Sequence, residues 1–230
     1  MTRPSNNRGA TLAAVLISIL ILLAALIAGC GGGGGGSSSS PQSCVKRGPV
    51  LSDAPIVIAY GDSTMGLQGP KLGVALGVEF DNRAVGGTML HQAMNGACEY
   101  PQDIAKELAG DPDARVVLEN FGINEAKDLY PVTRYETYLR RFVDTVRAAG
   151  KTPVIVTPIH VLDSHLISQG HLATLAQIGR NVAADMDVRL VDVYALEAVP
   201  SDFRADLIHP IPSFSQRIAD YTATQIKDLL

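Results

Sequence analysis

Short apolar runs alternate with stretches of helical periodicity along most of the chain. The runs are bounded by Gly, Pro or polar residues, which is typical of strands buried on both faces. We expect strands at residues 56–60, 78–85, 114–119, 153–157 and 188–193. Apolar positions recur at helical spacing over residues 133–149, 172–184 and 213–229. Strands that alternate with helices favour an α/β fold with a parallel sheet and helices on both faces.

The first residues depart from this pattern. Arg3 and Arg8 precede an uncharged apolar run over residues 11–27, and small residues separate that run from Cys30. This is the arrangement of a secretory signal peptide, and the small residues before a cysteine resemble the lipobox of bacterial lipoproteins. We expect residues 1–29 to be removed and Cys30 to become the lipidated N-terminus. The alternative is an uncleaved transmembrane anchor, because about 17–25 apolar residues can span a bilayer.

Glycines and serines alone make up residues 31–40. This composition is typical of a flexible tether. A phosphate loop is excluded because no strand precedes the segment and the Gly-Lys-Ser/Thr ending is absent. We expect residues 30–53 to form the lipidated cysteine, tether and leader, and residues 54–230 to form one domain. Because Gly31 and not an acidic residue follows the cysteine, the resemblance to lipoproteins implies the periplasmic face of an outer membrane.

The charge of the chain excludes some partners. Removing residues 1–29 takes away two arginines and no acid, which leaves 17 basic and 23 acidic residues. No run of Lys or Arg is present, so we expect no nucleic acid partner and membrane contact only through the lipid anchor. We also expect a monomer.

Three cysteines are present, and two remain once Cys30 carries lipid. Cys44 and Cys98 can form a disulfide in an exported chain, and two unpaired thiols are the alternative. No Cys/His cluster has the spacing of a zinc site, and we expect neither a metal nor a cofactor.

Four polar segments follow the predicted strands in chain order. They are residues 61–64, 82–87, 122–124 and 206–210. Ligands of open α/β sheets bind beyond the carboxyl ends of the strands. We therefore expect all four segments to meet at one edge of the sheet.

Ser63 is the candidate nucleophile, because it follows the first predicted strand in a Gly-Asp-Ser-Thr turn. His209 is the candidate base and Asp206 the residue that orients it. We expect these two to lie three apart on a helical turn, with side chains close enough to pair. The alternative bases are His91, His160, His165 and His171. None of them has an acidic residue three positions before it.

Gly87 and Asn124 are the candidate donors to an oxyanion, together with the backbone N–H of Ser63. A glycine N–H can be approached closely because no Cβ intervenes, and an amide side chain is a neutral donor suited to a developing alkoxide. Gly86 is the alternative to Gly87. Asn82 is expected to be a turn residue.

Ser63, Gly87, Asn124 and His209, in this order and with Asp206, resemble the four blocks of the SGNH, or GDSL-type, hydrolase superfamily. The resemblance covers roughly residues 54–230. It implies a three-layer α/β/α fold with a flavodoxin-like, five-stranded parallel sheet. Two positions depart from the usual pattern. Thr64 stands where Leu is commonest, and Glu125 stands where Asp often follows the Asn.

The resemblance implies an exported serine esterase that cleaves carboxylic esters through an acyl-enzyme. We expect a short, acetyl-type acyl group on a small molecule or polysaccharide, because the domain lacks a long apolar insertion that would hold a fatty chain. We expect the loop over residues 160–170 to line the pocket. Two alternatives remain open: an acyltransferase with the same triad, and a non-catalytic lipoprotein that binds glycans or lipids.

Overall fold

The computed structural model describes residues 55–96, 102–162 and 164–230. The predicted signal peptide and tether lie outside the described residues, as do Cys30, Cys44 and Cys98. Those predictions therefore remain predictions.

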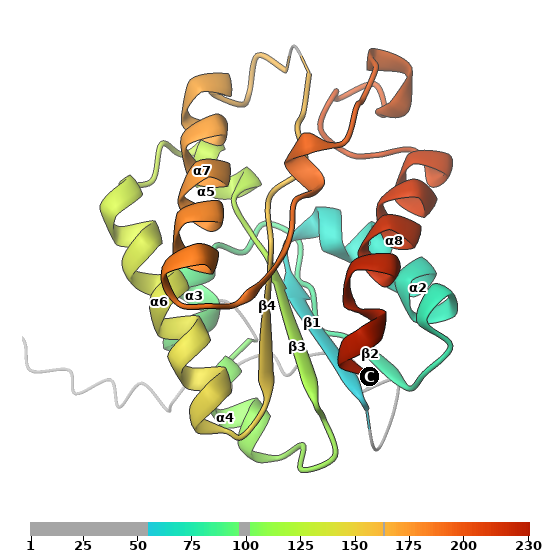
Figure 1. The fold of residues 1–230 in the computed structure, drawn as a ribbon. Coiled ribbons are helices and arrows are strands. Elements are labelled where there is room, and N and C mark those ends of the chain that lie inside the picture. Colours follow the sequence, from blue (N-terminus) through green and yellow to red (C-terminus); the bar gives the residue numbers. More distant parts are fainter. Residues whose placement is uncertain (1–54, 97–101, 163) are drawn as a thin grey trace, which may run out of the picture. The chain divides into compact units, whose positions relative to one another are not determined.

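A parallel sheet of five strands forms the centre of the domain (Figure 1). The strands are β1 (Val57–Gly61), β2 (Phe80–Asn82), β3 (Val116–Asn120), β4 (Thr152–Val156) and β5 (Arg189–Val191). Their order across the sheet is β2-β1-β3-β4-β5. Every residue of β1 and β3 is buried, which explains the apolar runs that predicted them, although β3 ends with the buried polar residues Glu119 and Asn120. The α/β prediction with five parallel strands is confirmed.

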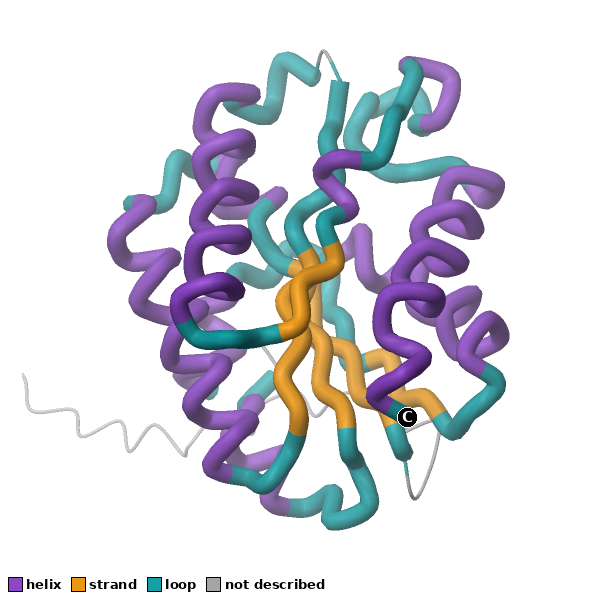
Figure 2. The backbone as a smooth tube through the Cα atoms, viewed as in Figure 1, coloured by secondary structure: helices purple, strands orange, loops and turns teal. Residues whose placement is uncertain are grey.

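Two helical layers cover the sheet. The helices are α2 (Ser63–Leu76), α3 (Leu90–Asn95), α4 (Ile104–Ala109), α5 (Ile123–Lys127), α6 (Val132–Ala148), α7 (Gln169–Asp185) and α8 (Pro212–Ile226). Figures 1 and 2 show α2 and α8 on one side of the sheet, and α6 and α7 on the other. This arrangement follows from the strand order, because right-handed crossovers place helices on opposite faces where the winding reverses.

The second strand is shorter than the sequence predicts. Residues 78–85 were expected to be extended, but β2 contains only Phe80–Asn82. The following residues still run along β1, since Arg83 N donates to Ala59 O at 2.8 Å and Val85 N donates to Gly61 O at 2.9 Å. This backbone pairing carries the chain to the carboxyl edge of the sheet.

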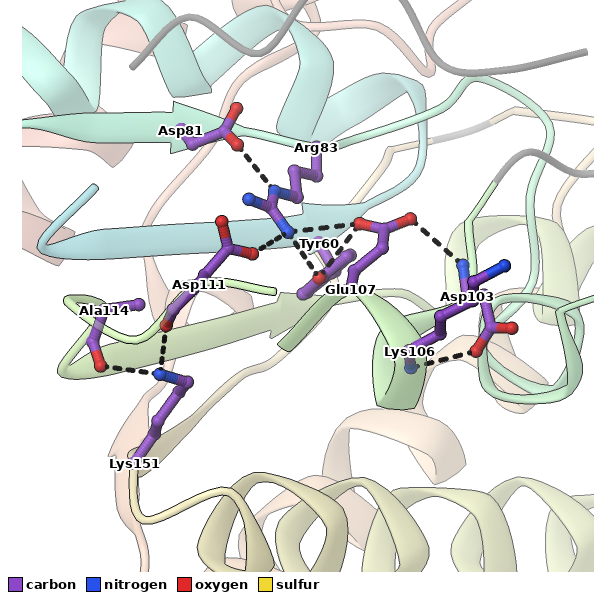
Figure 3. Close-up of polar contacts among 9 residues, drawn as sticks. All are labelled: Tyr60, Asp81, Arg83, Asp103, Lys106, Glu107, Asp111, Ala114 and Lys151. Carbon is purple, nitrogen blue, oxygen red and sulfur yellow. Dashed lines mark hydrogen bonds and ion pairs between the residues drawn. The ribbon is translucent and has the colours of Figure 1, made fainter. Parts of the chain in front are cut away.

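A buried ion cluster holds the exit of β2 in place (Figure 3). The side chain of Arg83 is only 1% exposed, and its guanidinium lies 2.6 Å from a carboxylate oxygen of Asp81 and 2.6 Å from one of Asp111. Its Nη1 is also 3.3 Å from Glu107 and 3.2 Å from the hydroxyl of Tyr60. The cluster therefore joins β1, β2 and α4 through one charge.

Asn82 stabilises the start of the domain's first helix. Pro70 lies inside α2 and has no N–H, so the carbonyl of Gly66 loses its helical donor. Asn82 Nδ2 lies 3.5 Å from that carbonyl, and Asn82 Oδ1 accepts from Ala84 N at 3.3 Å. Asn82 thus acts at the turn after β2.

Candidate active site

Ser63 is the first residue of α2 and follows β1 with one residue between. The turn is tight: a Cβ on Gly61 would lie 2.6 Å from Met65 Cβ and 2.7 Å from the carbonyl oxygen of Asn120. Only glycine fits there. Asp62 caps the helix by accepting from Thr64 N at 2.8 Å. The strand, the turn and the cap together place the Ser63 side chain at the carboxyl edge of the sheet.

His209 and Asp206 reach Ser63 from the loop before α8. His209 Nε2 lies 2.8 Å from Ser63 Oγ, and His209 Nδ1 lies 2.6 Å from Asp206 Oδ2. The three side chains form one hydrogen-bonded chain, in which Asp206 is exposed to solvent and the other two are half-buried.

The helical turn expected for residues 206–209 is wrong. Asp206 Oδ1 accepts from the backbone N–H groups of Ile208 and His209, both at 2.9 Å, and Leu207 has φ +56°. This is a turn organised by an Asp side chain, which competes with helical hydrogen bonding. The three-residue spacing still pairs the two side chains, because the left-handed Leu207 reverses the chain between them.

The electrostatics of this pair favour an ionised Asp206. Partial burial opposes ionisation, but hydrogen bonds from His209 and Ile208 lower the pKa of Asp206 to about 2. An ionised Asp206 accepts the proton of Nδ1–H, which leaves the lone pair of Nε2 directed at the hydroxyl of Ser63. The geometry therefore suits a base that removes the serine proton.

The alternative histidines have other partners. His91 stacks on Tyr130 with ring centroids 4.5 Å apart, and burial together with Arg134 lowers the pKa of His91. His160 stacks on Tyr194 at 4.6 Å. The remaining two lie apart from the nucleophile's hydrogen-bonded chain: His171 Nε2 is 2.9 Å from the carbonyl oxygen of Tyr130, and His165 is exposed.

The segment that carries the candidate oxyanion donors approaches the serine at Gly86. A Cβ built on Gly86 would be 3.6 Å from Ser63 Cβ, while Asn124 Nδ2 donates to the carbonyl of Thr88 at 3.0 Å. Gly87 lies between these two contacts and has φ +80°, a conformation that favours glycine. The segment of residues 86–88 thus connects the surroundings of Ser63 to Asn124. The N–H of Ser63 itself lies in the first turn of α2, where helical acceptors are missing.

The predicted pocket loop follows β4, and the residues that lead into it contact the third polar segment, residues 122–124. Gly122 has φ +128°, and a Cβ there would lie 2.9 Å from Pro158 Cγ. His160 follows two residues later, in a loop that continues to the start of α7. The loop therefore begins at the carboxyl edge that carries the candidate site.

Three fully buried carboxyl groups lie behind the site, and sequence reasoning did not identify them as a group. They are Asp62, Glu119 and Glu125. Burial raises the pKa of Asp62 to about 6 and that of Glu125 to about 8, and it raises the pKa of Glu119 well above its usual value. Each of these acids stands either among apolar residues or at a helix cap, so nothing in the sequence identifies them as a group.

A cavity in the described residues lies away from this site. It has a volume of about 510 Å³ and is lined by residues that include Arg147, Lys151, Arg189 and Leu229. These residues surround the amino ends of β4 and β5, at the edge opposite Ser63, so this cavity does not serve the candidate site.

The described part of the chain contains no group of three or more His, Cys, Asp or Glu side chains placed to hold a metal ion. Nor is any helix in that part long and apolar enough to cross a membrane.

Residues 48–216 match the model of the GDSL-like lipase/acylhydrolase family. The match covers more than half of the chain, so the chain belongs to this family and is a serine ester hydrolase of the SGNH/GDSL type. This membership sets aside the non-catalytic alternative. No curated protein sequence matches the chain significantly.

Solved structures share the fold at low sequence identity. A protein from Slackia heliotrinireducens assigned to the SGNH hydrolases has a TM-score of 0.64 at 22% identity, covering 75% of this chain and 99% of its own. An acetylxylan esterase from Geobacillus stearothermophilus has a TM-score of 0.61 at 13% identity, covering 76% and 96%. A lipase/acylhydrolase from Enterococcus faecalis has a TM-score of 0.61 at 15% identity, covering 75% and 95%. These likenesses support the three-layer fold.

Proposed function

We propose that this protein is an exported serine esterase that hydrolyses short acyl esters through an acyl-enzyme on Ser63. The observation that carries the proposal is the hydrogen-bonded chain from Asp206 through His209 to Ser63, with distances of 2.6 and 2.8 Å. It lies at the carboxyl edge of a parallel sheet, where ligands of such folds bind.

Acylation begins when His209 Nε2 takes the proton of the Ser63 hydroxyl. The serine oxygen attacks the ester carbonyl carbon, and the carbonyl oxygen becomes a tetrahedral oxyanion. Asp206 stabilises the imidazolium that forms, since its low pKa keeps it negative at neutral pH. When the carbon–oxygen bond of the ester breaks, the imidazolium returns its proton to the leaving alcohol.

Deacylation repeats these steps with water. His209 accepts a proton from the water as it attacks the acyl-enzyme, a second tetrahedral oxyanion forms, and Ser63 leaves with the proton from His209. The products are the carboxylic acid and the free enzyme. In both halves the oxyanion accepts hydrogen bonds from the N–H groups of Ser63 and Gly87 and from Nδ2 of Asn124, whose other hydrogen is already donated to Thr88.

The proposed substrate is an acetyl-type ester of a small molecule or a polysaccharide. A solved structure with the same fold is an acetylxylan esterase, which supports this class. Initial rates on p-nitrophenyl esters from acetate to palmitate test it, with Ser63→Ala as the control. We expect a maximum at acetate or propionate and a loss of at least ~10³-fold in Ser63→Ala. A Ser63→Ala variant with most of the wild-type activity would refute the proposed function. Transfer of the acyl group to an added sugar, faster than release of acetate, would instead indicate an acyltransferase.

We also propose that Cys30 is lipidated and tethers the esterase to an outer membrane, facing the periplasm. The supporting features are the apolar run over residues 11–27, the small residues before the cysteine and the Gly/Ser segment after it. Two or more acyl chains hold a protein stably on a bilayer, whereas one holds it only marginally. Mass spectrometry of the native N-terminus tests this proposal. A chain that retains Met1, or a mature N-terminus without lipid, would contradict it.

A further inference from the structure

Glu125 is a fully buried carboxyl group with both oxygens bound to backbone. Its Oε1 accepts from Leu90 N at 2.7 Å, and its Oε2 accepts from Gly122 N at 2.9 Å. Gly122 lies three positions before Glu125 at the start of α5, whereas Leu90 begins α3, 32 positions earlier than Gly122. One side chain therefore connects two separate backbones.

Those two backbones carry the candidate oxyanion donors. Leu90 begins α3, directly after the turn that contains Gly87 and Thr88, and Gly122 precedes Asn124 by two positions. Asn124 Nδ2 adds a third connection by donating to Thr88 O at 3.0 Å. The segment of residues 87–90 is thus tied to α5 at two points, one at Thr88 and one at Leu90.

We propose that Glu125 is a positioning residue that sets the distance between the Gly87 N–H and the Asn124 amide. The inference rests on the proposed function, because it assigns these two groups as oxyanion donors. Glu125 itself does not touch the substrate.

The surrounding structure explains why such a connection is needed. The pairing of residues 83–85 with β1 ends at Val85, so the turn that follows is no longer held by the sheet. Both α3 and α5 are shorter than two turns, and helices this short have little stability of their own. Pro158 holds Gly122 from its other side. A carboxyl group that accepts from both Gly122 N and Leu90 N transfers that rigidity to the segment of Gly87.

Exchange of Glu125 for Gln tests the role at almost constant volume. Glutamine has one acceptor oxygen, so its amide NH₂ must face either Leu90 N–H or Gly122 N–H, and one connection is lost. We expect kcat on p-nitrophenyl acetate to fall about 10–100-fold, because small displacements of a catalytic group have effects of this size. KM should change less than about threefold, since binding of the ground state does not use the oxyanion donors.

Glu119→Gln is the matched control. Glu119 is also fully buried, and its carboxyl group accepts from Phe121 N at 3.3 Å, outside the segment of residues 87–90. Burial raises the pKa of Glu119 as it does that of Glu125, so Glu119→Gln makes the same exchange at a second buried carboxyl group. We expect its kcat to stay within about threefold of the wild type.

Glu125→Asp tests for a partial rescue of kcat. If only side-chain volume mattered, this variant would be no more active than Glu125→Gln. Aspartate keeps two acceptor oxygens but is one methylene too short to keep both distances, so its kcat should lie between those of Glu125→Gln and the wild type. A second readout is the affinity for a boronic acid, whose tetrahedral adduct with Ser63 places an oxygen at the oxyanion donors. That affinity should fall in Glu125→Gln by the same factor as kcat/KM.

A folded Glu125→Gln with kcat and boronic acid affinity within threefold of the wild type would overturn the inference. So would equal losses of kcat in Glu125→Gln and Glu119→Gln. If Glu125→Gln fails to fold, Glu125→Asp decides: a lowered kcat at unchanged KM supports the positioning role, and an unchanged kcat refutes it. Activity that survives Ser63→Ala would refute the proposed function instead, so the two failures are distinguishable.

Discussion

The two carboxylate oxygens of Asp206 hold two different parts of His209. Oδ1 accepts from the backbone N–H at 2.9 Å, while Oδ2 lies 2.6 Å from ring nitrogen Nδ1. The same side chain therefore fixes the path of the loop and the orientation of the imidazole. A substitution that keeps the first bond can still destroy the second.

Asp206→Asn separates these two roles. The amide oxygen can still accept the backbone N–H, but the NH₂ group then faces Nδ1 and favours the tautomer that carries its proton on Nε2. That tautomer cannot accept the proton of Ser63, so we expect kcat to fall by ~10³–10⁴. Steady-state kinetics on p-nitrophenyl acetate, with circular dichroism to verify folding, measure this effect. A folded variant within tenfold of the wild type would remove Asp206 from the mechanism.

Asn124→Ala removes one proposed donor to the oxyanion. Loss of such a donor lowers kcat by ~10²–10³, and we expect KM to change far less. Asn95→Ala is the control, because Asn95 bonds only to Tyr138 and Arg141 at the surface of α3 and α6 in the described structure. Equal kcat values for the two variants would show that Asn124 does not stabilise the transition state.

The buried carboxyl group of Asp62 makes stability depend on pH. Burial raises its pKa to about 6 in the folded state, compared with ~3.9 for an unfolded chain. The folded protein therefore keeps this proton to a higher pH than the unfolded chain does. The stability that the proton contributes is complete below about pH 4 and is lost as pH rises toward 6. Glu125, with a pKa of about 8, acts in the same direction at higher pH, whereas Asp206, with a pKa of about 2, acts in the opposite direction below pH 4.

Asp62→Asn tests this dependence, because asparagine keeps the helix cap and cannot titrate. Between pH 4 and 6 the free energy of unfolding should fall less steeply in the variant, by at most about 1.4 kcal/mol per pH unit. Urea unfolding at several pH values gives both slopes. Parallel curves for the two proteins would mean that Asp62 ionises in the folded state as readily as in water.

Arg83→Met removes the central charge of the buried ion cluster. It leaves Asp81 buried without its cation, and breaking a buried ion pair in this way costs about 3–5 kcal/mol. We expect a loss of this size in the free energy of unfolding, measured with urea. Arg140→Met is the control, because Arg140 pairs with Glu136 and Asp185 at the surface, where ion pairs contribute little. Similar losses in both variants would contradict the role of the cluster.

Cys44 and Cys98 are expected to form a disulfide in the exported protein. The bond would close a loop of about 50 residues and contribute about 2–4 kcal/mol. Thiol titration of the denatured, unreduced mature protein measures it. Two free thiols would exclude the disulfide, whereas none, with two appearing after reduction, would support it.

The fold was predictable where apolar periodicity carries the information. The five strands and the three long helices produce runs long enough to identify, and the structure contains all of them. The range of α2 was not predicted, because glycines and Pro70 interrupt its apolar pattern. The short helices α3, α4 and α5 were not predicted either, because five or six residues are too few to establish a period. Residues 78–85 were expected to form one strand, although only three of them form β2.

The residues of the candidate site could be predicted from the sequence only in part. Sequence order located Ser63, Asp206 and His209, since each follows the end of a predicted strand. Arg83 and Glu125 gave no such signal. Each has one partner nearby in the chain, but the others, such as Asp111 for Arg83 and Leu90 for Glu125, are distant and meet them only in the folded structure. The left-handed Leu207 was also unpredictable, since leucine seldom adopts positive φ and the surrounding hydrogen bonds impose it.

Ser63 begins the first helix of the domain, while His209 precedes its last α-helix, 146 positions later. In the proposed mechanism, a nascent chain therefore carries its nucleophilic serine long before the base that activates it has been synthesised. Hydrolysis can start only after β5 has joined the sheet and the loop before α8 has closed over β1. The appearance of esterase activity would therefore mark the moment at which the two ends of the domain have met.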